Sequence, residues 1–403
     1  MTDTEAEIQR VVGSAEFAAA VARLASDHDR MVEDIVRLTE IPAPPFQESD
    51  RAQAYLELVR DHGLVEAKID PEGNVTALRR GEGEGLICVA AHLDTVFPAG
   101  TDVRVRREGT KLFAPGVGDD TRSLAVVLAW ARAMDAAGIR TKADLLFVAD
   151  VGEEGPGDLR GMRYLFQKGE FAGRISAFIT VDSPEMDRIA TVGVGSKRLR
   201  VTFRGPGGHS YGAFGLVNPM YPMADAITRL SRIDVPARPR TTFCASVIGG
   251  GTSINSIPNA VWTEFDLRSE SAAELERLER DFLRQVEEAV AAENGARSVR
   301  NGPVVAEITR TGDRPAGHTD ENTALPQLAL AALRAHGFNP TFEASSTDAN
   351  IPMSMGIPAI KVGSGGSGGR GHSLEEWIDV APENSLRGMS AGLATVLAVA
   401  RGC

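Results

Sequence analysis

Apolar runs and amphipathic stretches alternate along the first half of this chain. Apolar residues at helical spacing predict a helix from Ala15 to Glu40, ended by the proline-rich stretch Ile41–Phe46, and a second helix near Ser49–His62. Two short strands are then expected near 65–69 and 74–78, followed by alternating buried strands and helices at 86–91, 121–137, 143–149, 159–168 and 175–181. Such alternation is typical of an α/β fold with a doubly wound sheet.

The pattern changes near Gly195. Strands are expected at 198–204, 242–248, 260–268 and 304–309, with helices at 219–233 and 272–294. Together they would form an α+β unit of roughly 115 residues, which is an ordinary size for one domain. After Gly312 the alternation of helix and strand resumes and ends in a helix predicted at 382–401. The middle unit, 196–312, is therefore predicted to be inserted into one catalytic domain made of 1–195 and 313–403.

Composition and charge narrow the possible functions. The chain has 403 residues, 43% hydrophobic and 24% charged, as in an ordinary globular protein with room for two domains. A net charge of −12 argues against nucleic acid as a partner. No apolar stretch approaches the roughly 20 residues of a membrane span, and the first 13 residues show no signal peptide. With three scattered cysteines, these features predict a cytoplasmic enzyme.

Five short segments, far apart in the sequence, offer side chains of the types that bind metals. Three of them directly follow a predicted buried strand, and strand carboxyl ends are where ligands collect in open α/β sheets. Two imidazoles and three carboxylates meeting there would bind divalent cations, and one spare glutamate would make the site hydrolytic. We therefore expect a two-metal hydrolase. The segments are His92-Leu-Asp94, Gly118-Asp119-Asp120, Glu153-Glu154-Gly155, Val181-Asp182-Ser183 and Gly371-His372-Ser373.

Each segment taken singly has an ordinary structural interpretation. The His92 segment could cap a turn, the aspartate pair could cap a helix, and the glutamate pair could form an acidic surface turn. For two pairs of residues, the sequence does not decide which member plays which role. Of His92 and Asp94, one is a ligand and the other supports it. Of Glu153 and Glu154, one binds the cation while the other handles the proton of a bound water.

A glycine-rich motif suggests a different function. Gly363–Gly368 matches GxGxxG after a predicted strand, which on paper is a dinucleotide fingerprint. Its glycines run on to His372 instead of opening a helix, and no acidic residue follows at the right distance in a βαβ unit. A flexible loop that frames a metal ligand is the favoured interpretation.

The inserted unit carries further polar candidates. His209 lies in the segment Gly205-Pro-Gly-Gly-His209-Ser210, so we expect it to be exposed, although it could be a simple turn residue. Asn255 precedes a predicted strand and Arg268 closes it. Side chains of these three types can polarise a carbonyl or hold a carboxylate.

Together, these segments resemble the co-catalytic zinc exopeptidases, a family that includes peptidase T, bacterial glutamate carboxypeptidases, aminoacylase and succinyl-diaminopimelate desuccinylase. The resemblance runs in order over nearly the whole chain. It implies a zinc-exopeptidase-type catalytic domain with a mixed doubly wound sheet, and an inserted α+β lid or dimerisation domain. The segments that carry it are AHLDTV, GVGDDTRS, VGEEG, VDS, GPGGHS, SINSIPNAV with DLR, and GHSLEEW.

The resemblance also implies a cofactor of two zinc ions, with cobalt or manganese as substitutes. One zinc would be held by His92, Asp119 and Asp182, and the other by Asp119, Glu154 and His372. The peptide bond after Asp119 would be cis.

Further roles follow from the same resemblance. Asp94 would orient the first imidazole, and Glu153 would be the general base. His209 would reach the oxyanion from the partner subunit of a homodimer. Asn255 and Arg268 would contact the substrate.

Details of the motifs favour a peptidase. The aspartate at position 182 resembles the residue that peptidase T has as its fifth ligand, whereas desuccinylase-like and aminoacylase-like members commonly carry glutamate at this position. The stretches GPGGHSYGAFG and SSTDANIPMSMGIPAI are also similar to peptidases. Many relatives read DDK where this chain has Asp120-Thr121-Arg122.

The expected function is a di- or tripeptide exopeptidase, such as an aminopeptidase or tripeptidase. An amidohydrolase of N-acyl or otherwise modified amino acids is the alternative, and a non-catalytic binding protein is a minor one.

Overall fold

The computed structural model describes residues 2–60 and 62–402. The chain divides into two compact units. Unit 1 comprises Met1–Gly193 and His318–Cys403, and unit 2 comprises Val194–Gly317. Unit 2 therefore interrupts the sequence of unit 1.

Unit 1 is built on a mixed sheet with the strand order β1-β2-β6-β3-β7-β17-β8, and β16 also lies beside β8. Strands β6, β3, β7 and β17 are parallel, whereas β2 and β8 run antiparallel to their neighbours in that group. This confirms the predicted α/β class with a mixed sheet. The strands are β1 (Val65–Ile69), β2 (Val75–Arg79), β3 (Leu86–His92), β6 (Asp144–Asp150), β7 (Ala177–Val181), β8 (Arg188–Gly193), β16 (Thr341–Ser345) and β17 (Ala359–Val362).

Helices cover both faces of this sheet. Val89 and Ile179 pack on one face, in a core shared with α1, α2, α3, α4, α5, α9 and α11. Cys88 and Phe178 face the opposite side, against α6 and α10. Because the central strands are buried on both faces, their sequences read as continuous apolar runs. The helices are α1 (Asp3–Val12), α2 (Ala15–Ser26), α3 (His28–Thr39), α4 (Ser49–Val59), α5 (Arg122–Ala136), α6 (Arg160–Gln167), α9 (Ala324–Ala335), α10 (Asn350–Ser354) and α11 (Pro382–Gly402).

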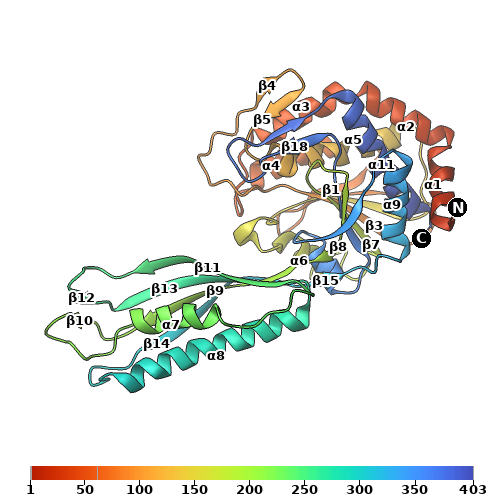
Figure 1. Cartoon of the computed structure of the whole chain (residues 1–403). Coiled ribbons are helices and arrows are strands. Elements are labelled where there is room, and N and C mark those ends of the chain that lie inside the picture. Colours follow the sequence, from red (N-terminus) through yellow and green to blue (C-terminus); the bar gives the residue numbers. More distant parts are fainter. Residues whose placement is uncertain (1, 61, 403) are drawn as a thin grey trace. The chain divides into compact units, whose positions relative to one another are not determined.

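The N-terminal helices differ from the sequence prediction in two ways. The helix predicted from Ala15 to Glu40 is two helices, α2 and α3, which meet at Asp27, where the backbone leaves the helical conformation. Helix α1 was not predicted at all. It begins with a capping box, in which Thr2 and Glu5 satisfy each other's backbone N–H groups. In Figure 1, α1 (red) lies beside the C-terminal helix α11 (blue).

A second small sheet in unit 1 has the order β18-β19-β5-β4. It joins β4 (Arg106–Glu108) and β5 (Lys111–Phe113) to β18 (Ser367–Gly369) and β19 (Trp377–Asp379). The glycine-rich segment therefore leads from strand β17 into strand β18 and opens no helix. A dinucleotide fingerprint needs a helix at that point, so the structure argues against that interpretation.

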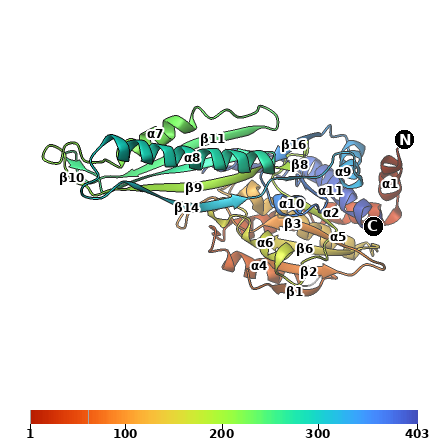
Figure 2. The same cartoon turned by 90° about the horizontal axis from the view of Figure 1, so that it is seen from below.

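Unit 2 is an antiparallel sheet, β11-β13-β9-β14, with two helices on one face (Figures 1 and 2). Phe203 and Phe265 from the sheet pack with Met223 of α7 and Phe282 of α8. The elements are β9 (Gly195–Arg204), β10 (Gly208–His209), α7 (Met220–Leu230), β11 (Thr241–Gly250), β12 (Ser256–Ile257), β13 (Ala260–Ser269), α8 (Ala272–Ala296) and β14 (Val305–Arg314).

Across both units, we found no helix within residues 2–60 and 62–402 that combines the length and the apolar character of a membrane span.

Candidate metal centre

All five predicted ligand segments lie in unit 1 and come from strand ends or the loops beyond them. His92 is the last residue of β3, and Asp182 directly follows β7. Glu154 follows β6, Asp119 lies with a non-helical backbone in the short turn η1 (Val117–Thr121) before α5, and His372 lies between β18 and β19. Strands β6, β3 and β7 are parallel neighbours. Their carboxyl ends therefore deliver ligands to one edge of the sheet.

The side chains converge on Asp119. Its Oδ1 lies 2.9 Å from Nε2 of His92, and its Oδ2 lies 3.1 Å from Nε2 of His372. Nε2 of His372 is also 2.9 Å from Oε1 of Glu154. The two oxygens of Asp119 thus face two different imidazoles, which is the arrangement required of a carboxylate that bridges two cations.

Two groups of three residues each bring potential ligand atoms within 4.8 Å of one another. One contains His92, Asp119 and Glu154, and the other contains His92, Asp120 and Asp182. The resemblance implied Asp119 beside Asp182, so the appearance of Asp120 in the second group was not expected. Asp120 is fully buried, and its Oδ2 accepts the backbone N–H of His92 at 3.1 Å.

The orientation of His92 indicates a need for positive charge at this site. Its Nδ1 lies 3.0 Å from the carbonyl oxygen of Asp94, so Nδ1 donates its proton there. In the neutral ring Nε2 is then an acceptor, yet it faces an acceptor oxygen of Asp119. Two acceptors this close require a proton or a metal cation between them. Imidazole nitrogens and carboxylate oxygens are ligands that zinc prefers, so these residues fit a dinuclear metal site.

The pKa values of the residues in the cluster also indicate a need for positive charge at this site. Hydrogen bonds that the His372 ring donates to the carboxylates of Asp119 and Glu154 raise the pKa of His372 to about 11. Burial alone would lower the pKa of His92, but the surrounding carboxylates, Asp120 foremost, raise it well above its ordinary value. Burial also raises the pKa of Glu154 to about 7. These shifts favour protonated imidazoles, and a cation that binds must displace such protons.

Asp94 connects the imidazole to the glutamate pair. Its carboxylate is fully buried and accepts the backbone N–H groups of Glu153 at 2.9 Å and Glu154 at 2.8 Å. Its contact with His92 runs through the backbone carbonyl, while the carboxylate lies 3.8 Å from Nδ1. Asp94 therefore fixes the backbone that carries both glutamates, in addition to holding the ring.

Glu376 is a supporting residue that sequence reasoning missed. Its carboxylate accepts the backbone N–H groups of Gly116, Gly118 and Asp119 at 2.9, 2.7 and 2.9 Å. It thereby holds the turn that presents Asp119, whose bond to Asp120 is cis, as the resemblance implied. Glu376 belongs to the motif GHSLEEW, but nothing in the sequence links it to a turn some 260 residues away.

We expect Glu376→Ala to weaken metal binding, because the turn that carries Asp119 would lose three hydrogen bonds to one carboxylate. Loss of such a support typically costs about 10–100-fold in metal affinity. Glu375→Ala is the matched control, since the side chain of Glu375 is 70% exposed and pairs with Arg370. Chelator competition would measure both variants. Equal affinity in the Glu376 variant and the control would contradict the assignment.

In unit 2, His209 and Asn255 are neighbours. Strand β10 pairs with β12, so His209 lies opposite Ser256, and the N–H of Ser210 donates to the carbonyl of Asn255 at 2.9 Å. His209 is exposed, and its Nδ1 accepts the backbone N–H groups of Tyr211 and Gly212 at 3.2 Å. A neutral ring held this way carries its proton on Nε2, and this N–H can donate to a further group.

Arg268 lies elsewhere in unit 2. It is near the end of β13, whereas Asn255 and His209 lie by the start of that strand at Ala260. Eight residues of extended strand correspond to roughly 26 Å. Arg268 is half-buried and donates to Asp266 at 2.7 Å. Within this unit the structure does not bring Arg268 together with the other two candidates.

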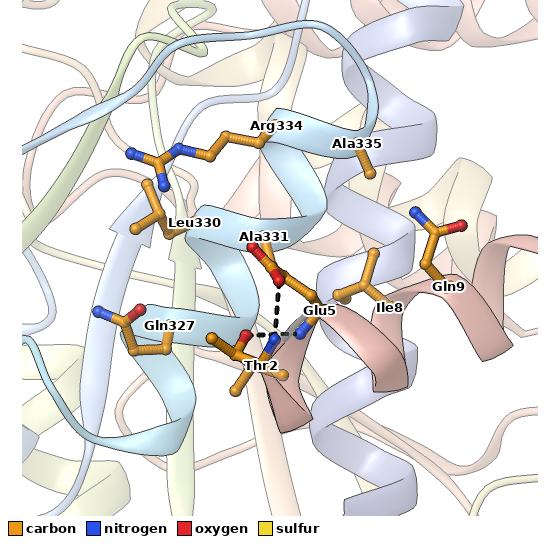
Figure 3. Close-up of a pocket in the computed structure, with 10 residues that line it drawn as sticks. Thr2, Glu5, Ile8, Gln9, Gln327, Leu330, Ala331, Arg334 and Ala335 are labelled. Atoms are coloured by element: carbon orange, nitrogen blue, oxygen red, sulfur yellow. Dashed lines mark hydrogen bonds between the residues drawn. The ribbon is translucent and has the colours of Figure 1, made fainter.

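The pocket in Figure 3 is separate from the candidate site. It has a volume of about 380 Å³ and lies between α1 and α9, where Glu5, Gln327 and Arg334 line it. The dashed contacts in the figure are the capping box of α1. None of the predicted ligands lines this pocket.

Comparison with known proteins gives consistent results. The sequence profile described as Peptidase family M20/M25/M40 matches residues 88–398. A stretch of 127 residues is 33% identical to a provisionally named LysW-lysine/LysW-ornithine hydrolase of Pyrococcus furiosus, covering 32% of this chain and 35% of that protein. A stretch of 238 residues is 29% identical to a succinyl-diaminopimelate desuccinylase of Leptothrix cholodnii, covering 54% and 60%. The matches thus span about a third and about three fifths of these relatives.

Among solved structures, aminopeptidase PepT of Bacillus cereus superimposes with a TM-score of 0.74. The alignment covers 93% of this chain and 99% of that one, at 19% identity. At this identity the similarity demonstrates a shared fold.

Proposed function

The chain belongs to the peptidase family M20/M25/M40, a family of hydrolases, and from this premise we propose that it is a dinuclear zinc exopeptidase that cleaves di- or tripeptides. The observation that carries the proposal is the double contact of Asp119, whose two oxygens face His92 and His372. We place this activity in the cytoplasm, as the composition predicts.

The proposed ligands are His92, Asp119 and Asp182 for one zinc, and Asp119, Glu154 and His372 for the other. Divalent cations bound there would lower the pKa of a water molecule and polarise the substrate carbonyl.

Glu153 is the proposed general base. The residue is 6% exposed, and its backbone N–H donates to Asp94 beside the proposed ligand Glu154. A carboxylate in this position takes the proton of the attacking water and later passes it to the leaving nitrogen.

We further propose that the protein acts as a homodimer assembled through unit 2. Strand β11 is an edge strand of its sheet, and it exposes Val247 by 45% and Ile248 by 63%. An exposed apolar edge strand is a ready surface for pairing with another chain. In such a dimer His209 would donate from Nε2 to the oxyanion of the partner's site. Asn255 and Arg268 would contact the substrate.

An amidohydrolase acting on N-acyl amino acids is the second candidate, favoured by the desuccinylase among the relatives. A panel of tripeptides, dipeptides and N-acyl amino acids, assayed with zinc, cobalt or manganese, separates the two. Higher kcat/KM for the peptides supports the exopeptidase. Turnover confined to N-acyl amino acids would replace it with the alternative.

We expect close to two metal ions per chain in protein purified without chelators, because the two carboxylate oxygens of Asp119 face two different imidazoles, those of His92 and His372. Exhaustive chelation should remove the activity, and added zinc, cobalt or manganese should restore it. Elemental analysis and an activity assay measure the two results. Protein that remains fully active after the metal has been removed would refute the proposal.

A further inference from the structure

Lys361 is the one buried lysine among residues 2–60 and 62–402, with 9% of the residue exposed. It lies in β17, between β7 and β8. Its Nζ donates to Oγ of Ser183 at 2.9 Å. A buried ammonium group is costly unless it has polar or charged partners, so this position calls for a reason beyond filling space.

The pleat of the sheet places Lys361 on the same face as a proposed ligand. Ala359 of β17 packs with Phe178 of β7 in the core under α6 and α10. Residues two apart on a strand share a face, so Lys361 follows Ala359 there, and Asp182 follows Phe178 at the end of the adjacent parallel strand. The ammonium group and the carboxylate therefore belong to one row at the carboxyl edge.

The segment between them is an unusual turn. Ser183 has a φ of +62°, a left-handed conformation that residues with a Cβ rarely adopt. Its hydroxyl accepts from Lys361 and donates to the carbonyl of Asp182 at 2.6 Å. Ser364 donates to the carbonyl of Ser183 through its N–H at 2.8 Å and its hydroxyl at 2.9 Å. Ser364 thus holds the carbonyl of Ser183, and Lys361 holds its hydroxyl.

Electrostatics connects the same two residues. Burial raises the pKa of Asp182, and Lys361 is the strongest influence that opposes it. The ammonium group therefore compensates the negative charge of a carboxylate that lies in a cluster with Asp120 and His92.

We propose that Lys361 is a positioning residue for the metal centre: it anchors the left-handed turn at Ser183 and so aims Asp182 at the cation position that this carboxylate shares with His92. The inference rests on the proposed function, since it assigns Lys361 to one of the two proposed metal positions.

Lys361→Met tests the proposal, because methionine keeps the buried stem but cannot donate to Ser183. We expect one of the two zinc ions to bind about 10–100-fold more weakly while the other is unaffected, the usual effect of removing a ligand's support. The absorption spectrum of the cobalt-loaded protein should change accordingly. Lys361→Arg, which keeps both charge and donors, should restore binding to within a few-fold.

A double-mutant cycle tests the route through the turn. Glycine adopts the left-handed conformation without strain and has no hydroxyl to anchor. In a Ser183→Gly background, Lys361→Met should therefore cost much less metal affinity than it does alone. Full additivity would overturn the link. If Lys361→Met does not fold, Ser183→Ala provides the same test, because it removes the hydroxyl that Lys361 anchors.

Three other outcomes of these experiments can be told apart. A lower melting temperature with unchanged zinc affinity and cobalt spectrum would show a purely structural lysine and overturn the proposal. Tighter zinc binding by Lys361→Met would show that the ammonium group opposes the cation, and would overturn it too. Wild-type protein that binds no metal would instead remove the proposed function, and this inference with it.

Discussion

Replacing Glu153 by alanine should lower turnover by orders of magnitude and leave the metal in place, whereas replacing Glu154 should release metal. Glu154 lies 2.9 Å from His372 and belongs to a group of potential ligand atoms, while Glu153 belongs to neither group. A general base contributes typically about 10²–10⁴-fold to the rate, so Glu153→Ala should lower kcat by that amount. Steady-state kinetics and elemental analysis of both purified variants provide the measurement.

The two glutamates are well matched as mutual controls. They are adjacent, their exposures are 6% and 7%, and Asp94 holds the backbone N–H of each. Effects of burial or of a disturbed loop should therefore be similar in the two variants, and the difference between them isolates the chemistry. Equal metal loss in both would mean that the roles within the pair are misassigned.

The parts of the fold that the sequence predicted well are those with a strong local signal. Strands β3, β6 and β7 are buried on both faces, so each reads as an apolar run that ends at a polar residue. Parallel strands bring those ends to one edge, which is why the sequence alone predicts that His92, Glu154 and Asp182 belong to one site.

Long-range contacts carry no such signal. The strands of the small sheet β18-β19-β5-β4 are three residues long, too short for a visible period. Glu376 reaches the turn at Asp119 only because that sheet pairs Trp377 with Phe113. Asp120 joins the cluster for a similar reason, since its carboxylate accepts the backbone N–H of His92, 28 residues away in the sequence. Sequence motifs therefore identify the proposed metal ligands better than they identify the residues that position those ligands.

Removing the imidazole of His209 should leave both metals bound and the fold intact, yet lower turnover by about two to three powers of ten, the usual cost of losing an oxyanion donor. The reason is that its Nδ1 is occupied by two backbone N–H groups, so a neutral ring offers Nε2–H to a substrate. His318→Ala is a suitable control, because His318 is also exposed and lies outside every proposed role. Comparison of kcat and metal content in the two variants measures the effect.

A mixed dimer decides whether His209 serves the partner's active site. One chain carries His209→Ala and the other carries Glu153→Ala, and each parent dimer is nearly inactive. If the histidine acts across the dimer, the site of the first chain has its own Glu153 and receives the intact histidine of the second, while the other site carries both defects. The purified hybrid should then regain about half of the wild-type activity. If the histidine acts within its own chain, every site keeps one defect, and a hybrid no more active than its parents would refute the assignment.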